Sequence, residues 1–170
     1  MQRLIQSLSL ALALSVPTAA MAIQAPSAPI TDPQVFVNTA GPANEFEIES
    51  SQLALKQTKT PAILTFARRM IADHGAAAKK MATAAKAQGV SVPAGLDPPG
   101  KENMQQLSPL KGKAFDSAYV SMQVMAHDQA VALFKGYSTN GKPGALKSFA
   151  AATLPTLQSH QRMIHSIAGK

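Results

Sequence analysis

Four side chains in this sequence combine the chemistry of metal ligands with a spacing that directs them inward: Glu47, His74, His127 and His160. Each belongs to a different segment in which apolar residues recur every three or four positions, the period of an amphipathic helix. Each falls on the apolar stripe of its segment or beside it. Because imidazole and carboxylate donors suit zinc, iron, copper or manganese, the pattern predicts a site for one transition-metal ion.

The depth of these residues along their helices supports a shared site. Glu47 and His74 lie near the middle of the helices predicted below, and His127 lies within about two residues of the middle of its own. His160 lies about four to five residues past the middle, which is about 7 Å at ~1.5 Å per residue. We expect the remaining histidine, His165, at the surface.

A purely structural polar layer is the alternative to a metal site. In such a layer the imidazoles and Glu47 would satisfy one another by hydrogen bonds, because a charged carboxylate buried alone is costly. In a metal site, further polar groups would orient the rings from a second layer. The candidates for this second layer are Asp73, Asp116, Tyr119 and Gln123.

Several known kinds of site do not match the sequence. Ferritin-like di-iron sites take Glu-x-x-His motifs from two helices, but Ile71 stands three residues before His74 and Leu157 three before His160. The chain also has no Gly-rich phosphate loop, His-Glu-x-x-His motif or Gly-x-Ser-x-Gly motif. The sequence thus argues against a di-iron centre. It favours a non-enzymatic function but leaves the question of an enzyme open.

Methionines also occur at helical spacing, and their thioethers are soft donors for copper. Four of them are Met70, Met122, Met125 and Met163. Methionine in this setting usually fills gaps in a core. We therefore predict that these four side chains belong to the core.

Start and stop signals delimit the helices. Asp32-Pro33 and Thr60-Pro61 each place a capping residue before a proline at the first helical position, and Gly89 supplies a stop. The predicted long helices span residues 33–59, 61–88, 113–138 and 143–168, and a short helical piece spans residues 102–107.

This pattern predicts an all-α fold: a ferritin-like antiparallel four-helix bundle with a short extra helix between the second and third long helices. No segment shows a convincing strand period of two. Gly41-Pro42 lies inside the first predicted helix. Because proline removes a backbone hydrogen bond, we expect a kink there or a restart near Ala43, and a bend at Pro155.

The N-terminus has the features of a secretory signal. Arg3 precedes an apolar run at residues 4–16, and Ala20-Met21-Ala22 places small residues where a signal peptidase cuts. The run is too short to span a bilayer, which takes about 20 apolar residues, and no later segment qualifies. We predict a signal peptide at residues 1–22 cleaved after Ala22, an extended tail at 23–32, a bundle domain at 33–168, and a periplasmic or secreted location.

The composition limits the classes of binding partner that we expect. The formal net charge is +7, but the lysines are scattered, tryptophan is absent and tyrosine occurs twice. Nucleic-acid-binding proteins concentrate positive charge on one face, with aromatic residues among it, so we expect no nucleic-acid partner. Weak contact with anionic surfaces of the cell envelope is compatible with the charge. Cysteine is absent, so stability must come from the core rather than from disulfides.

Four segments resemble a known family: NEFEIESSQLAL, FARRMIADH, AFDSAYVSMQVMAHDQAVALF and FAAATLPTLQSHQRMI. They are similar to DUF4142, an exported bacterial ferritin-like domain of unknown function, over residues 36–164. The resemblance implies a ferritin-like four-helix fold and an exported location, and implies no activity. Gly41-Pro42 departs from the family. The residues that match its polar signature are Glu47, Asp73, His74, Asp116, Tyr119, His127 and His160.

Two classes of function remain open. In the first, the protein is an exported bundle that binds a metal ion or small ligand through the buried Glu/His layer and takes part in stress responses or metal handling. In the second, it is a non-enzymatic interaction or scaffold module of the cell envelope, and its polar core is only structural.

Overall fold

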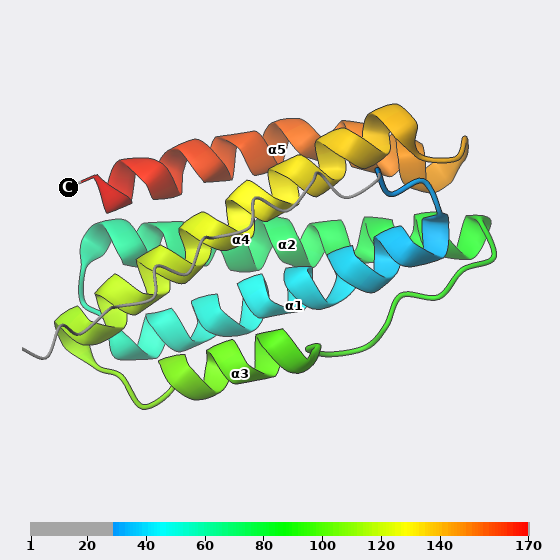
Figure 1. Ribbon diagram of the computed structural model, residues 1–170. Helices are drawn as coiled ribbons and strands as arrows, with labels where there is room; N and C mark the ends of the chain where they lie inside the picture. Colours follow the sequence, from blue (N-terminus) through cyan, green and yellow to red (C-terminus); the bar gives the residue numbers. More distant parts are fainter. Residues whose placement is uncertain (1–28, 170) are drawn as a thin grey trace, which may run out of the picture.

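The computed structural model describes residues 29–169, which form an antiparallel four-helix bundle with one short additional helix (Figure 1). No strand occurs in this range. The all-α bundle predicted from the sequence is therefore confirmed. The predicted signal peptide and residues 23–28 of the predicted tail lie outside the described residues. The helices are α1 (Pro33–Gln57), α2 (Pro61–Ala87), α3 (Pro98–Leu107), α4 (Gly112–Asn140) and α5 (Ala145–Ala168).

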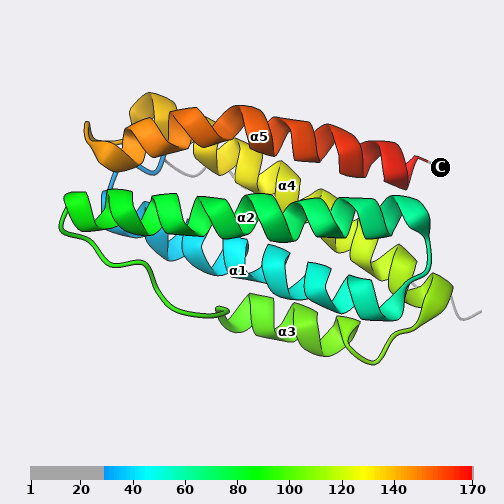
Figure 2. The same ribbon diagram turned by 180° about the vertical axis from the view of Figure 1, so that it is seen from behind.

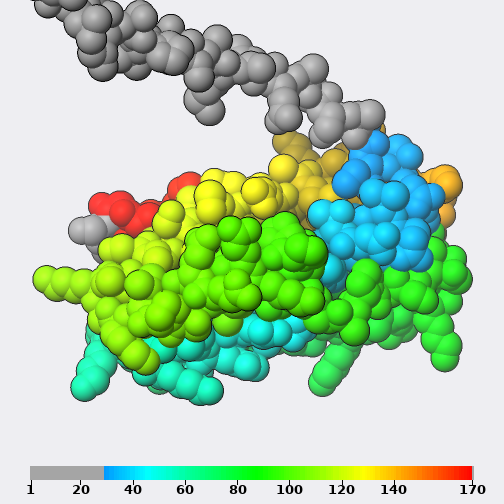
Figure 3. Space-filling model, turned by 60° about the horizontal axis from the view of Figure 1, so that its bottom comes forward, coloured from blue at the N-terminus to red at the C-terminus, as the bar shows by residue number. Residues whose placement is uncertain are grey.

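The four long helices enclose one core, with each helix antiparallel to the neighbours it contacts. Helix α1 packs on α2 and α4, and α5 packs on α4 and α2. Helices α2 and α5 run side by side on the face seen from behind (Figure 2). On another face, α3 lies over α1 and α4 (Figure 3). Within the described part of the chain, no helix combines the length and apolarity needed to cross a membrane.

Caps explain where the helices begin. The Asp32 carboxylate accepts hydrogen bonds from the backbone N–H groups of Gln34 and Val35 and so caps α1. Asp97 caps α3 in the same way by accepting from the N–H of Gly100. This cap places the start of α3 at Pro98, four residues before the predicted position. The sequence prediction missed the cap because it treated the prolines of this segment as loop.

The predicted restart near Ala43 was wrong, since α1 continues without interruption through Gly41 and Pro42. Both residues are buried. The loop after α2 packs closely here: a Cβ on Gly41 would lie 2.7 Å from Cγ1 of Val92. Tertiary packing therefore holds the helix through a sequence that would disfavour it in isolation. Helix α5 likewise contains Pro155 without interruption.

Two apolar clusters fill the two ends of the bundle, and a polar layer separates them. One cluster includes Phe36 stacked on Tyr137, with ring centroids 4.0 Å apart. The other includes Phe66 and Phe115. Between the clusters along each long helix come the buried polar residues Glu47, Ser50, Ser51, His74, Gln123, His127 and His160.

The prediction that all four methionines belong to the core was wrong in part. Met70 is fully buried in the cluster around Phe66. Met122 and Met163 pack against that cluster while only partly buried. Met125, by contrast, is 53% exposed on α4.

Candidate metal centre

Three histidines from three different helices meet in the polar layer. His74 of α2, His127 of α4 and His160 of α5 each offer one ring nitrogen, and these nitrogens all lie within 4.8 Å of one another. The ring centroids are 5.7, 5.4 and 5.6 Å apart for the pairs 74–127, 74–160 and 127–160. The three rings thus form a nearly equilateral triangle. Their exposed fractions are 5%, 1% and 1%.

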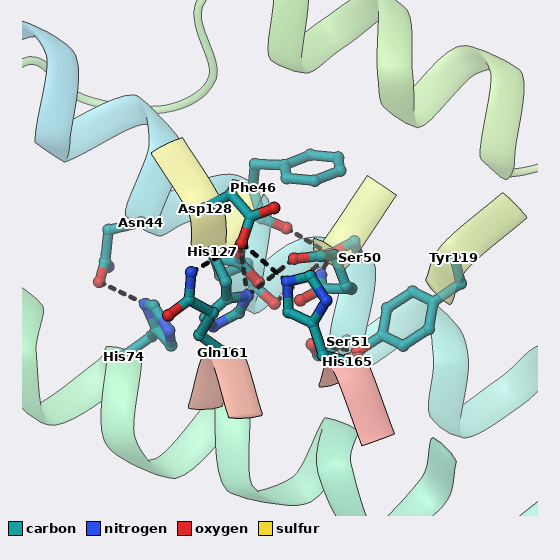
Figure 4. A network of polar contacts seen from close by, with 12 residues as sticks. Asn44, Phe46, Ser50, Ser51, His74, Tyr119, His127, Asp128, Gln161 and His165 are labelled. Atoms are coloured by element: carbon teal, nitrogen blue, oxygen red, sulfur yellow. Dashed lines mark hydrogen bonds and ion pairs between the residues drawn. The ribbon is translucent and has the colours of Figure 1, made fainter. Parts of the chain in front are cut away.

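One nitrogen of each ring is held by an oxygen acceptor. His74 Nδ1 lies 3.0 Å from Oδ1 of Asn44 (Figure 4). His127 Nδ1 lies 2.9 Å from the backbone oxygen of Gln123, and His160 Nε2 lies 2.8 Å from Oδ2 of Asp73. Because an oxygen acceptor selects the protonated ring nitrogen, each of these nitrogens carries the hydrogen and the opposite nitrogen keeps its lone pair.

The opposite nitrogens are His74 Nε2, His127 Nε2 and His160 Nδ1. All three are buried and have no hydrogen-bond partner among residues 29–169. Nearly all buried polar atoms in proteins are paired, so three unpaired acceptors in one layer call for an explanation. An arrangement with one nitrogen oriented by an oxygen and the other left free is typical of histidines that bind metals.

Electrostatics keep these rings neutral. Burial, helped by the neighbouring imidazoles His127 and His160, lowers the pKa of His74 to about 3. Burial also lowers the pKa of His127 to about 4. The pKa of His160 is lowered by burial as well, although Asp73 opposes the change. The rings are therefore unprotonated at neutral pH, which is the form that binds metals.

Glu47 lies next to the three histidines but does not belong to the cluster in which their ring nitrogens meet. Its side chain is buried, and Oε1 lies 3.6 Å from Nδ1 of His127, the nitrogen that carries the hydrogen. Its Oε2 has no partner in the described part of the chain. Burial raises the pKa of Glu47 to about 8, against a lowering influence of the Gln123 amide. Without a nearby cation the carboxyl group is therefore protonated at neutral pH.

The four residues expected in a second layer fall into two groups. Asp73 holds His160 and also accepts from Nε of Arg69 at 3.2 Å. Gln123 holds His127 through its backbone oxygen, and its side-chain amide donates to Oγ of Ser50 at 3.0 Å. Both act directly on the layer of rings.

The other two lie away from the rings. The hydroxyl of Tyr119 is 2.8 Å from Oγ of Ser51, inside the apolar cluster around Phe66. Asp116 accepts from Oγ1 of Thr60 at 2.6 Å. Sequence reasoning missed Asn44, the partner of His74. Its position three residues before Glu47, on the same side of α1, was the available signal.

Two openings reach the layer of rings. A surface groove between α2 and α5 is lined by His74 and His160 and by solvent-facing residues such as Lys80 and Thr156. On another side, a cavity of about 300 Å³ reaches His74 and Glu47 from between α1, α4 and the start of α3. The layer is thus buried but not sealed.

The chain belongs to the DUF4142 family, a domain of unknown function, whose model matches residues 16–167. This confirms the resemblance found in the sequence. No curated protein matches the chain.

Solved structures of CopM are similar to this fold. The Cu(II)-bound form has a TM-score of 0.66 and 17% sequence identity, covering 81% of this chain and 96% of the CopM chain. The Cu(I)-bound form has a TM-score of 0.66 and 18% identity, covering 81% and 95%. The Ag-bound form obtained by co-crystallization has a TM-score of 0.65 and 19% identity, with the same coverage. At these identities the likeness establishes a shared fold.

Proposed function

We propose that this DUF4142 protein binds a single transition-metal ion through the free ring nitrogens of His74, His127 and His160. One observation carries the proposal: three buried and neutral imidazoles each bring a ring nitrogen within 4.8 Å of the others, and each ring has one buried nitrogen without a hydrogen-bond partner among residues 29–169. Three histidines with a further position left open is an established coordination for zinc, and imidazole is a common ligand for copper and iron.

A cation satisfies this group better than the other available partners. Leaving the nitrogens unpaired would cost about 1–3 kcal/mol for each. A water molecule has only two hydrogens to donate to three lone pairs. Protonating one ring is disfavoured because burial lowers the pKa of both His74 and His127. The same reasoning disfavours the alternative of a purely structural polar core.

The donor set favours particular ions. Neutral imidazoles suit zinc, copper and iron better than manganese, which prefers oxygen donors. At equal free concentration the site should bind Cu(II) more tightly than Zn(II), following the general order of divalent ions. CopM, which shares the fold, has been solved with copper and with silver bound, and this adds support for copper.

Glu47 has a separate part in the proposal. Its carboxyl group lies on the hydrogen-bearing side of His127, so we assign it the charge that compensates a buried cation, rather than a direct bond to the ion. The groove between α2 and α5 reaches His74 and His160 from solvent and supplies a route of entry. The signal features of residues 1–22 support a location in the periplasm or outside the cell, and we propose a role in metal handling there.

Metal analysis of protein purified without a histidine tag tests the proposal. We expect one equivalent of Cu(II) or Zn(II) to bind, and the His74→Ala variant to bind it at least about 100-fold more weakly, because loss of a ligand should exceed the 10- to 100-fold effect of losing a second-layer partner. The matched control is His165→Ala, which removes a half-exposed histidine from α5.

Competition with a chromogenic chelator gives the affinities, and circular dichroism reports the fold. Equal metal binding by the unmodified protein and a folded His74→Ala variant would contradict the proposal. So would the absence of stoichiometric metal in the unmodified protein, and the function would then be that of a scaffold.

A further inference from the structure

The cavity beside the histidine layer has the character of a small-molecule site. Its volume is about 300 Å³, at the lower end of the range of about 300–1,000 Å³ for ligand pockets. A cavity of about half this size can hold benzene. The space beside the histidines therefore suits one aromatic ring with a short extension.

The lining of the cavity is mainly apolar, with polar side chains from several helices among it. The apolar part includes Met81, Met122, Leu133, Phe134 and Leu157. His74 and Glu47, which are 5% and 4% exposed, also line the cavity. Nε2 of His74 and Oε2 of Glu47 are unpaired among the described residues. The cavity thus brings mainly apolar surface up to two buried side chains that each carry an unsatisfied polar atom.

Charge excludes one class of occupant. Among residues 29–169, no lysine or arginine lines the cavity, while Glu47 and Asp97 both do. With Glu47 assigned to compensate the charge of the bound ion, a phosphate or carboxylate would bring a further negative charge into the cavity with no lysine or arginine to pair with it. The chemistry selects a neutral and largely apolar molecule.

The rim gives a reason for the exposure of Met125. This residue lines the cavity together with Asn103 and Pro99 of α3, and half of its side chain faces solvent. An apolar side chain at the entrance favours the approach of an apolar molecule.

We propose that the metal-bound protein takes up a small, mostly apolar molecule that ends in one neutral nitrogen donor. Its nitrogen would occupy the coordination position that three histidines leave open, and its apolar body would fill the cavity. This inference rests on the proposed metal site, since three protein ligands leave at least one position of a four-coordinate ion free. A nitrogen donor matches the preference of an ion that already has three imidazole ligands.

Titration of the Cu(II)-loaded protein with imidazole and with 4-phenylimidazole tests the inference. Both compounds present the same donor, but only the second carries an apolar ring. We expect both to change the visible absorption and electron paramagnetic resonance of the bound copper, and 4-phenylimidazole to bind about 10- to 100-fold more tightly because its ring is buried. Gel filtration with metal analysis must show that copper stays on the protein.

A pair of substitutions on α4 locates the apolar contact. Ala130 lines the cavity, whereas Ala132 is exposed and lies outside it. We expect Ala130→Phe to abolish the preference for 4-phenylimidazole while imidazole still binds, and Ala132→Phe to leave both affinities unchanged. Ala43→Phe, from the α1 side of the cavity, provides a second filling variant if Ala130→Phe does not fold.

Different failures have different meanings. Copper that binds to the protein but responds to neither compound would overturn the inference and leave the metal site intact. Equal affinity for the two compounds, or a preference that survives in both filling variants, would also overturn it. Failure of the unmodified protein to bind copper or zinc would remove the metal site and this inference together.

Discussion

Helix α5 carries two histidines that each pair with an aspartate at the same distance. His160 Nε2 lies 2.8 Å from Asp73, and His165 Nε2 lies 2.8 Å from Asp128. The pairs differ in their surroundings, because His160 is 1% exposed and His165 is 50% exposed. The unpaired nitrogen of His160 is buried near two other rings, whereas His165 lies at the surface, where Asp128 also accepts from Gln161.

The difference shows that a histidine–aspartate pair does not by itself make a site. In both pairs the carboxylate determines which ring nitrogen carries the hydrogen. Only His160 has a buried ring, although its partner Asp73 is 37% exposed, and so only in that pair is the opposite lone pair shielded from water and close to two other imidazoles. The property that distinguishes His160 is thus supplied by α2 and α4, and the comparison can be tested by changing each partner in turn.

The largest effect should be the loss of metal affinity when the carboxylate that pairs with His160 is replaced. Asp73→Asn keeps the size of the side chain but weakens the hydrogen bond that fixes the His160 ring. We expect metal affinity to fall by about 10- to 100-fold, the usual cost of losing such a partner. Asp128→Asn should leave the affinity unchanged. Chelator competition at pH 7 measures both, and equal losses in the two variants would contradict the distinction between buried and exposed pairs.

The next largest effect should be the pH dependence of stability, which comes from the buried histidines and from Glu47. In the unfolded chain the histidines titrate near pH 6.5, whereas folding lowers the pKa of His74 and His127 to about 3 and 4. The unfolded state therefore binds more protons between about pH 4 and 6.5, and stability rises with pH in that window. Glu47 acts in the opposite direction, since folding raises its pKa from 4.5 to about 8.

These opposing changes predict that the free energy of unfolding passes through a maximum as the pH is raised. Above about pH 7 the unfolded histidines have released most of their protons and the effect of Glu47 is the larger, so the metal-free protein should lose stability up to about pH 8, with a slope of at most about 1.4 kcal/mol per pH unit. Urea unfolding in the presence of a chelator measures the profile. Glu47→Gln should remove the decline, and Glu49→Gln on the same helix should retain it. A decline that persists in Glu47→Gln would assign it to another group.

The fold was largely predictable because its signals are local. Apolar spacing identified the helices, and the Asp32-Pro33 and Thr60-Pro61 pairs placed two starts correctly. The continuity of α1 through Gly41 and Pro42 was not predictable from local signals, because these residues are buried and Gly41 packs against Val92, a contact between residues far apart in the sequence. The start of α3 carried a local signal in Asp97, which was overlooked.

Within the site, the sequence predicted which faces point inward but not which atoms meet. The three histidines converge, whereas the hydrogen-bond partner of His74 is Asn44 rather than Glu47. Asp116 was a poor candidate for orienting His127 on simple geometry. Eleven residues along a helix correspond to about 16 Å, too far for contact with that ring.

The smallest effect should come from breaking the exposed pair. His165 and Asp128 are 50% and 46% exposed, so solvent screens their attraction, and holding two side chains in one geometry costs entropy. We expect His165→Ala to change the free energy of unfolding by less than about 1 kcal/mol, and the change to shrink further in 1 M salt because ions screen exposed charges. Urea unfolding of metal-free protein at low and high salt measures it. A loss above about 2 kcal/mol, or one insensitive to salt, would mean that the surface pair stabilises the bundle as a buried contact does, and the contrast with His160 would then rest on metal binding alone.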